Sequence, residues 1–407
     1  MQIKEVEKTN WSIIAILYLV GIGAAVQFAK VPPILDQLIE HYVISLSTAG
    51  FLISSVGMMG LVLGIASVSF IKQFGFRNLL LIFVLIGAFT AFSESLLPEF
   101  SSMVMLRILE GSSHLVIVVA APTLMLRFSR PQDTSVVMGI WGSFFGLGFV
   151  LSNAFSPWIT ETLGWQSIFA VHGIFLLVLF FLLYAALPQE IREERKSLQE
   201  LMQELKRVHL ETWKNKPIMS LGMVFLWHTF MFVSILTFFN ALILQEYKLD
   251  KAFASNWIAL SSFVSILGTI GAGIFIRLFN RPFLQLIVSF TVILLTTVSL
   301  FSLSVDTSIG LVISLVLFLC GGVIQGSVFA LIPLVTVDSD QVLIANGAIA
   351  QLGKAYFLRS HYQILLVNRV LHVISLSLPF HPQMKISAKG LFWSDLGIET
   401  SQASVIH

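Results

Sequence analysis

The sequence predicts an all-α integral membrane fold of two pseudo-symmetric six-helix halves, with about ten clear transmembrane helices because the second half is incomplete. Three observations predict it: the composition, the length of the apolar segments and an internal repeat. The 407 residues are 56% hydrophobic and 11% charged, with a mean hydropathy of +0.89. A soluble domain has about 25% charged residues, so the surface of this chain is suited to a lipid solvent.

The composition also excludes several classes of protein. A net charge of +2 gives no support for nucleic-acid binding. Cys320 is the single cysteine, so neither an intrachain disulfide nor a thiolate metal site is expected. The sequence has no phosphate-binding Gly-Lys-Ser loop, no His-Glu-x-x-His motif and no nucleophile elbow. We therefore expect no enzyme activity and no cofactor.

Ten segments reach the length of about 20 apolar residues that crosses a bilayer as a helix. The first follows Lys4 and Lys8, but it is longer than a signal-peptide core, so we expect it to be retained as a span. The segments are 11–31, 47–71, 79–98, 101–127, 134–160, 165–188, 217–245, 252–277, 283–303 and 308–337.

Basic residues alternate between the connecting loops as the positive-inside rule requires. If the N-terminus is cytoplasmic, the outside segments hold only Lys30, Lys248 and Lys251. We therefore expect a protein of the plasma (inner) membrane with a cytoplasmic N-terminus. The basic residues expected inside are Lys4, Lys8, Lys72, Arg77, Arg127, Arg130, Arg192, Arg195, Lys196, Lys206, Arg207, Lys214, Lys216, Arg277 and Arg281.

A hydrophilic stretch at 189–216 separates the first six spans from the rest. Its apolar residues fall on one helical face, which predicts a cytoplasmic linker with an amphipathic helix at the membrane interface. The predicted domains are an N-terminal six-helix half (1–188), this linker (189–216), a C-terminal half with helices 7–10 and the start of helix 11 (217–353), and an atypical polar tail (354–407).

Three short elements recur in the same order in equivalent spans of the two halves. The first recurs at an offset of 205 residues (70 to 275), and the third has the same offset (142 to 347). Parallel halves around a central site are a known transporter architecture. The matching elements are 70–74 with 275–279, Gly111 and Pro122 with Gly322 and Pro333, and 142–148 with 347–353.

With these features the chain resembles the major facilitator superfamily. Arg107-Ile108-Leu109-Glu110-Gly111 is similar to the family's Arg-x-x-x-Gly signature in the fourth span, and Gly164-Trp165-Gln166 with Phe169 is similar to its Gly-Trp-Arg-x-x-Phe. The stretch 110–123 resembles the cyanate-permease-like subgroup. The resemblance covers about residues 10–353 and implies secondary transport by alternating access.

The loop after the second span matches the family's Gly-x-x-x-Asp-Arg-x-Gly-Arg signature only in part. Lys72 stands for the Asp, whereas Gly75 and the later Arg77 fit. In the family this loop is associated with conformational switching, so gating is expected to differ here. The gating-loop candidates, in this loop and in its repeat, are Lys72, Gly75, Arg77, Arg277 and Arg281.

The repeat ends after Gly353. Residues 354–407 hold four of the nine histidines, and Arg359 and Arg369 argue against a normal eleventh helix. We interpret this tail as the product of a reading-frame shift, with an unusual but genuine tail as the alternative. A shift would leave helices 11 and 12 absent or poorly formed and could make the product inactive.

Ionisable groups at membrane depth are the first candidates for binding substrate or protons. Arg107, Glu110 and His114 share one face of the fourth span. They predict either an anion- or proton-responsive cluster at a central cavity or a structural ion pair. Lys30, one turn from Gln27, would either attract an anionic substrate or extend to the headgroups.

Four more polar groups lie on predicted spans. Each could face the cavity or hydrogen-bond a neighbouring helix. His172, on the sixth span, is expected at the periphery. The four additional candidates are Asn153, His228, Asn240 and Gln325.

The sequence therefore predicts a monomeric secondary transporter, a symporter or antiporter driven by a proton gradient. Its expected partners are a small-molecule substrate and the lipid bilayer, and Arg107 and Lys30 favour an organic or inorganic anion. Two alternatives stay open. One is a drug-type efflux transporter, and the other is a non-transporting or inactive membrane protein because of the aberrant C-terminus.

Overall fold

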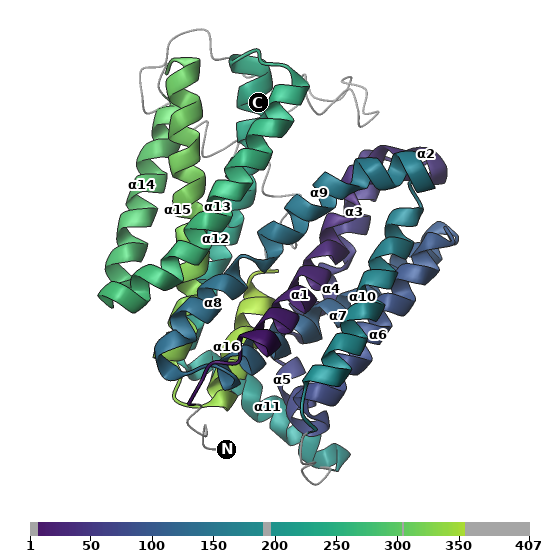
Figure 1. Cartoon of the computed structure of the whole chain (residues 1–407), viewed down its shortest axis with the longest axis vertical. Coiled ribbons are helices and arrows are strands. Elements are labelled where there is room, and N and C mark those ends of the chain that lie inside the picture. Colours follow the sequence, from purple (N-terminus) through teal and green to yellow (C-terminus); the bar gives the residue numbers. More distant parts are fainter. Residues whose placement is uncertain (1–6, 190–196, 303–304, 355–407) are drawn as a thin grey trace, which may run out of the picture. The chain divides into compact units, whose positions relative to one another are not determined.

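The computed structural model describes residues 7–189, 197–302 and 305–354. The tail from residue 355 onward, on which the frame-shift interpretation depends, lies outside the described residues. Within these ranges every regular element is a helix (Figure 1). The all-α prediction is therefore confirmed.

The first half begins at the predicted first span and ends just before the linker. It contains ten α-helices and two short 3-10 turns, at Pro32–Ile34 and Pro131–Asp133. The helices are α1 (Trp11–Ala29), α2 (Leu35–Tyr42), α3 (Leu46–Ser55), α4 (Gly57–Leu63), α5 (Ser67–Phe74), α6 (Phe76–Ser95), α7 (Phe100–Arg127), α8 (Thr134–Gly142), α9 (Phe144–Leu163) and α10 (Ser167–Ala186).

The linker and the second half follow the predicted segments. The linker helix begins with a capping box in which Ser197 and Glu200 satisfy each other's backbone N–H groups. The elements are α11 (Leu198–Lys214), α12 (Lys216–Ala241) with a π-helical turn (Leu242–Glu246), α13 (Lys251–Phe279), α14 (Pro282–Ser302), α15 (Thr307–Val335) and α16 (Ser339–Leu352).

Eight helices in the described ranges are long and apolar enough to cross a membrane, or nine if one bent pair counts as a span. That pair is α4 and α5, which meet at 86° within the predicted second span. The bend coincides with a contact to the second half, because the Ile65 N–H donates to the Gln351 side chain (2.9 Å) instead of continuing the helical ladder. A side chain inserted into that ladder is a recognised cause of a sharp kink.

The repeat seen in the sequence also governs the packing of both halves. A Cβ atom on Gly111 of α7 would run into the carbonyl oxygen of Val56, and one on Gly322 of α15 into that of Ser265. Each glycine therefore lets the fourth helix of its half touch the backbone of the second. Gly75 and Asn280, 205 residues apart, both end a helix with positive φ, +82° and +49°.

One apolar core joins the first half to α12, α15 and α16 of the second. It includes Ile14 of α1, Ile117 of α7, Val328 of α15 and Ile349 of α16. Across the halves, α8 packs on α13 and α15, and α16 packs on α7 and α4. The helices that carry the candidate residues therefore belong to a packed interior.

Candidate functional site

A cluster of four charged side chains and one histidine lies inside the first half, and we call it the buried charge cluster. Its members are Lys30 after α1, Glu94 on α6, Arg107 and Glu110 on α7, and His172 on α10. Their exposed fractions are between 0% and 2%. Four separate segments of the chain therefore each contribute at least one polar group to one enclosed site.

Lys30 is at the centre of the buried charge cluster. Its Nζ lies 2.6 Å from Glu94 Oε2, 2.6 Å from Glu110 Oε1 and 3.3 Å from His172 Nδ1. The three ammonium protons thus have three acceptors. His172 Nδ1 accepts from Lys30, so its Nε2 carries the proton and donates to the Gly23 carbonyl oxygen at 3.0 Å.

Arg107 connects the same carboxylates to the backbone of two other segments. It forms an ion pair with Glu110 and lies 3.7 Å from Glu94 Oε1. Its Nη2 donates to the Gln27 carbonyl oxygen (2.7 Å) and its Nε to that of Leu52 (3.2 Å). The guanidinium therefore holds α7 against the end of α1 and against α3.

With both carboxylates ionised, the two cations and two anions of the cluster balance. Buried charges are tolerated only when they are paired and hydrogen-bonded, because each loses its hydration. One atom departs from this rule: Glu94 Oε1 is buried without a hydrogen-bond partner among the described residues.

The structure corrects two expectations and adds a residue that the sequence analysis missed. Lys30 does not extend to the headgroups, because its side chain is fully buried among carboxylates. His172 is not peripheral, because it contacts Lys30. Glu94 was not predicted, although it is the only charged residue of the predicted third span, 79–98. An intramembrane carboxylate is itself a signal of function.

His114 shares the α7 face of Glu110 but lies in a different environment. Its Nδ1 is 3.0 Å from the Ala24 carbonyl oxygen, and its ring meets Phe28 edge-on with centroids 4.9 Å apart. Gln27 donates from Nε2 to the Ser113 hydroxyl at 3.1 Å. The spacing along α7 therefore predicted a common face but not a common set of partners.

Of the four additional candidates, the structure brings only the described side chains of His228 and Gln325 together. Asn153 is exposed and donates to the Phe149 carbonyl oxygen of its own helix at 3.0 Å. His228 is buried on α12 with Nδ1 unsatisfied among the described residues. Gln325 donates to the Gly142 carbonyl oxygen across the halves at 2.7 Å. The side chain of Asn240, on α12, lies outside the described part of the chain.

Two of the gating-loop candidates form ion pairs between the halves. Lys72 Nζ lies 2.8 Å from Asp340 Oδ2, and Arg277 Nη1 lies 3.1 Å from Asp133 Oδ1. The Lys72–Asp340 pair joins the end of the second span to the start of the eleventh. The Arg277–Asp133 pair joins the end of the eighth span to the start of the fifth. We call them the reciprocal ion pairs, because the cation comes from the first half in one and from the second half in the other.

The other gating-loop candidates act within one half. Arg77 donates to the carbonyl oxygens of Leu187 and Tyr184, each at 3.0 Å, and so caps the end of α10. Gly75 provides the positive φ that turns α5 into α6. Arg281 is exposed after α13.

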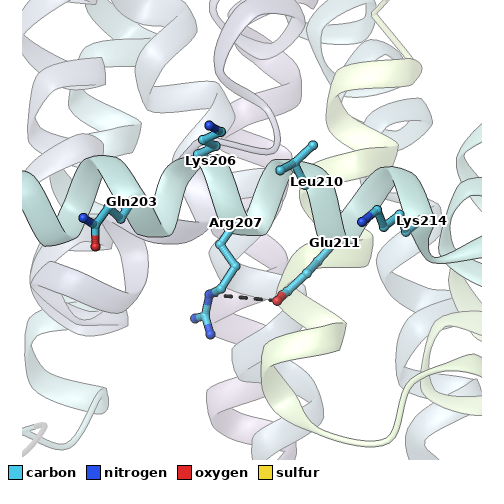
Figure 2. Close-up of a pocket in the computed structure, with 6 residues that line it drawn as sticks. All are labelled: Gln203, Lys206, Arg207, Leu210, Glu211 and Lys214. Atoms are coloured by element: carbon cyan, nitrogen blue, oxygen red, sulfur yellow. Dashed lines mark ion pairs between the residues drawn. The ribbon is translucent and has the colours of Figure 1, made fainter.

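A shallow surface hollow lies along the linker helix α11, far in sequence from the buried charge cluster. Arg207 and Glu211 face each other there at 3.9 Å, and their side chains are 62% and 57% exposed (Figure 2). Lys206 and Leu210 project from the opposite side of the helix (Figure 2). The side chains that line the hollow are all exposed, whereas α11 buries Val208 and Thr212 on its remaining face, so this hollow carries no site.

Metal binding finds no support in the described ranges, where no group of three or more His, Cys, Asp or Glu side chains could hold an ion. Apolar spanning helices, an internal repeat and an enclosed charge cluster define a polytopic membrane transporter. The family profile of the Major Facilitator Superfamily matches residues 12–357. The chain belongs to this superfamily of transporters and not to a family of enzymes.

Individual relatives are more distant. A gallate transporter from Pseudomonas putida is 25% identical over 188 residues, which are 45% of this chain and 41% of that protein. The match therefore spans about two fifths of the length of this relative. The cyanate-permease-like resemblance finds no support in it.

Two solved structures share the fold. The proton:xylose symporter XylE, bound to 6-bromo-6-deoxy-D-glucose, has a TM-score of 0.68 at 15% identity and covers 89% of this chain and 90% of its own. The human organic anion transporter MFSD10 has a TM-score of 0.67 at 14% identity, and the match covers 87% of this chain and 94% of that one. At these identities the likeness is one of fold.

Proposed function

We propose that this chain moves a small organic anion across the plasma (inner) membrane by alternating access, coupled to protons through the buried charge cluster. The observation that carries the proposal is Lys30, fully buried between the carboxylates of Glu94 and Glu110. A buried ion cluster on four chain segments is costly to retain for packing alone.

Proton uptake at Glu94 would change the charge of the cluster from zero to positive. Its Oε1 accepts no hydrogen bond from the described residues and lies 3.7 Å from Arg107 Nη1. The excess positive charge in an apolar interior acts over a longer range than it would in water. It would favour an anion elsewhere in the protein, and by linkage the anion would favour the proton to the same extent.

Two similar proteins support an anionic substrate. The curated relative transports gallate and one structural neighbour is an organic anion transporter, as their names state. We propose transport by the monomer, with the N-terminus cytoplasmic.

The test uses the full chain in proteoliposomes with an imposed inward proton gradient. The solutes are gallate, benzoate, cyanate, xylose and the cationic dye ethidium. We expect gradient-driven accumulation of an organic anion. Transport of ethidium alone would favour drug-type efflux, and transport of none of these solutes would favour the non-transporting alternative.

Proton coupling is tested with Glu94→Gln, which mimics the protonated carboxyl. We expect this variant to exchange anion across the membrane but not to accumulate it under a proton gradient. The matched control is Glu161→Gln, because Glu161 is exposed on α9. Normal accumulation by Glu94→Gln would remove Glu94 from the coupling mechanism.

The domain division at residues 188, 216 and 353 and the frame-shift origin of residues 354–407 stay proposals. The family profile ends at residue 357, close to the predicted boundary after Gly353. Sequencing the source gene across codon 354 tests the shift. An uninterrupted frame with the same tail in near relatives would contradict it.

A further inference from the structure

The break between α4 and α5 is occupied by a side chain from the other half. The Gly64 N–H bonds to the Gly60 carbonyl oxygen at 2.9 Å, so the ladder of α4 is intact up to the break. The next N–H, that of Ile65, donates instead to Gln351 Oε1 of α16 at 2.9 Å. Ile65 is 1% exposed, so its N–H needs an acceptor within the protein.

The backbones of the two halves meet at this point. A Cβ atom on Gly64 would lie 2.5 Å from Gln351 Cβ, and one on Gly347 would lie 2.9 Å from the Gly64 carbonyl oxygen. Both positions therefore require glycine for the close approach of α16 to the break. The two glycines thus place the Gln351 side chain against the backbone of the second span.

The repeat contains a matched position at which the inserted side chain is missing. With the offset of 205 residues, Gln351 corresponds to Gly146 and Ile65 to Ile270. Gly146 has no side chain that could reach Ile270, and α13 runs unbroken through this residue. The break therefore accompanies the glutamine and not the repeated architecture.

Helix α5 is tied to the second half at both of its ends. Ile65 stands just before α5 and bonds to Gln351, and Lys72, in its last turn, pairs with Asp340. The Asp340 side chain is 58% exposed, and exposed ion pairs are weak. The bond of the buried Ile65 N–H is therefore the tie that holds the bend.

We propose that Gln351 is a positioning residue for transport, and that exchange of the Ile65 N–H between Gln351 and the Leu61 carbonyl oxygen switches the second span between a bent and a straight form. This inference rests on the proposed function and names an element that switches in alternating access. In a straight helix the Ile65 N–H bonds to Leu61, four residues earlier. The N–H thus has an acceptor in both forms, and neither leaves a buried donor unsatisfied. Two such forms can be close in free energy, as a switching element requires.

Release of Gln351 would loosen the hold of α16 on α5. Of the two ties, only the exposed pair of Lys72 and Asp340 would remain. The halves would then be free to part at the ends of these helices, which face the cytoplasm in the proposed orientation. A change at one buried hydrogen bond would thereby open one side of the protein.

The bend is measured without substrate, on the purified full chain in detergent. Electron paramagnetic resonance gives the distance between spin labels at Met58 on α4 and Phe74 on α5, which are 41% and 40% exposed, in a Cys320→Ala background. Sixteen residues span about 24 Å in a straight helix, whereas two arms that meet at 86° bring the labelled positions to about 18 Å. We expect Gln351→Leu to lengthen the mean distance by about 6 Å. Gln351→Glu, which keeps the acceptor oxygen, should retain the wild-type distance.

The matched control is Gln341→Leu. Gln341 lies on the same helix and also accepts a backbone N–H, that of Val337 at 3.2 Å, but within its own half. Its distance should equal that of the wild type, and an equal lengthening would show that the bend does not depend on Gln351. Gly347→Ala is the second variant, since it pushes α16 away from the Gly64 carbonyl oxygen and leaves the glutamine in place. It should lengthen the distance as Gln351→Leu does.

Separation of the helices is measured by thiol labelling of Val68→Cys, because the Val68 side chain is fully buried against Gly347. Gln351→Leu should accelerate labelling about two- to tenfold, the range set by the net free energy of one hydrogen bond. Unchanged distances in both Gln351→Leu and Gly347→Ala would overturn the switch, even in a chain that transports an organic anion. Longer distances and faster labelling in a chain that transports none of the tested solutes would support the switch and contradict the proposed function.

Discussion

Lys72, at the end of α5, forms an ion pair with Asp340, at the start of α16, with 2.8 Å between Nζ and Oδ2. The repeat predicts a mate for this contact, and the structure contains it as Arg277 with Asp133. Asp133 also accepts a hydrogen bond from the Thr9 hydroxyl at 2.6 Å. The reciprocal ion pairs thus connect the halves twice, each time with the roles of the halves exchanged.

The first prediction concerns the Arg277–Asp133 pair. Arg277→Gln should loosen the contact of α8 with α13 and expose Ser135, which is 8% exposed. Partly exposed ion pairs stabilise by up to about 1 kcal/mol, so thiol labelling of Ser135→Cys in a Cys320→Ala background should accelerate by up to about fivefold. Arg281→Gln, which changes an exposed arginine close by, is the control and should leave the rate unchanged. Equal rates in both variants would show that the pair does not hold the halves together.

The second prediction concerns the central lysine of the buried charge cluster. Lys30→Met leaves Glu94 and Glu110 with Arg107 as their remaining cation. Breaking a buried pair by removing one partner costs about 3–5 kcal/mol, so the thermal stability of the purified protein should fall sharply. Adding Glu94→Gln should restore a large part of it, because the charges balance again. A double variant as unstable as the single one would contradict the charge balance.

The third prediction concerns the two hydrogen bonds of His172. His172→Phe removes the acceptor of one Lys30 proton and the donor to the Gly23 carbonyl oxygen. Leaving a buried polar group unsatisfied costs about 1–3 kcal/mol. The loss of thermal stability should therefore be smaller than for Lys30→Met. A fully stable variant would mean that the imidazole is not part of the cluster's hydrogen bonding.

The fourth prediction concerns the repeated glycines. Gly322→Ala should push α15 away from the backbone of Ser265 and cost about 1–3 kcal/mol, as overpacking does. Gly271→Ala on α13 is the matched control, because a Cβ atom there meets nothing within 4 Å. That variant should be neutral or more stable by about 0.5–1 kcal/mol. Comparing the melting temperatures of the two variants tests whether the close approach of α15 to the Ser265 backbone, and not helix propensity, determines the effect of Gly322→Ala on stability.

The positions of the spans and the repeat could be read from the sequence because apolar length and short motifs are local signals. The structure keeps the predicted equivalence of Lys72 with Arg277 and of Gly111 with Gly322. The break in the second span could not be predicted, since it depends on a hydrogen bond from Ile65 to Gln351, 286 residues later in the sequence.

The candidate site was predictable only along a single helix. The spacing of Arg107 and Glu110 indicated their ion pair, which the structure contains. It could not indicate that Glu94 and His172 complete the cluster, because their helices approach α7 through packing and not through sequence order. It also placed His114 with Glu110, whereas the structure pairs it with Phe28.

The distribution of the buried charge cluster along the chain has a consequence for biogenesis. Lys30 is synthesised 64 residues before Glu94 and 80 before Glu110. Lys30 lies at the C-terminal end of α1, and a lysine at the end of a span can extend to the headgroups while its partners are still absent. The buried position of Lys30 is therefore reached only after the carboxylates of α6 and α7 have been made.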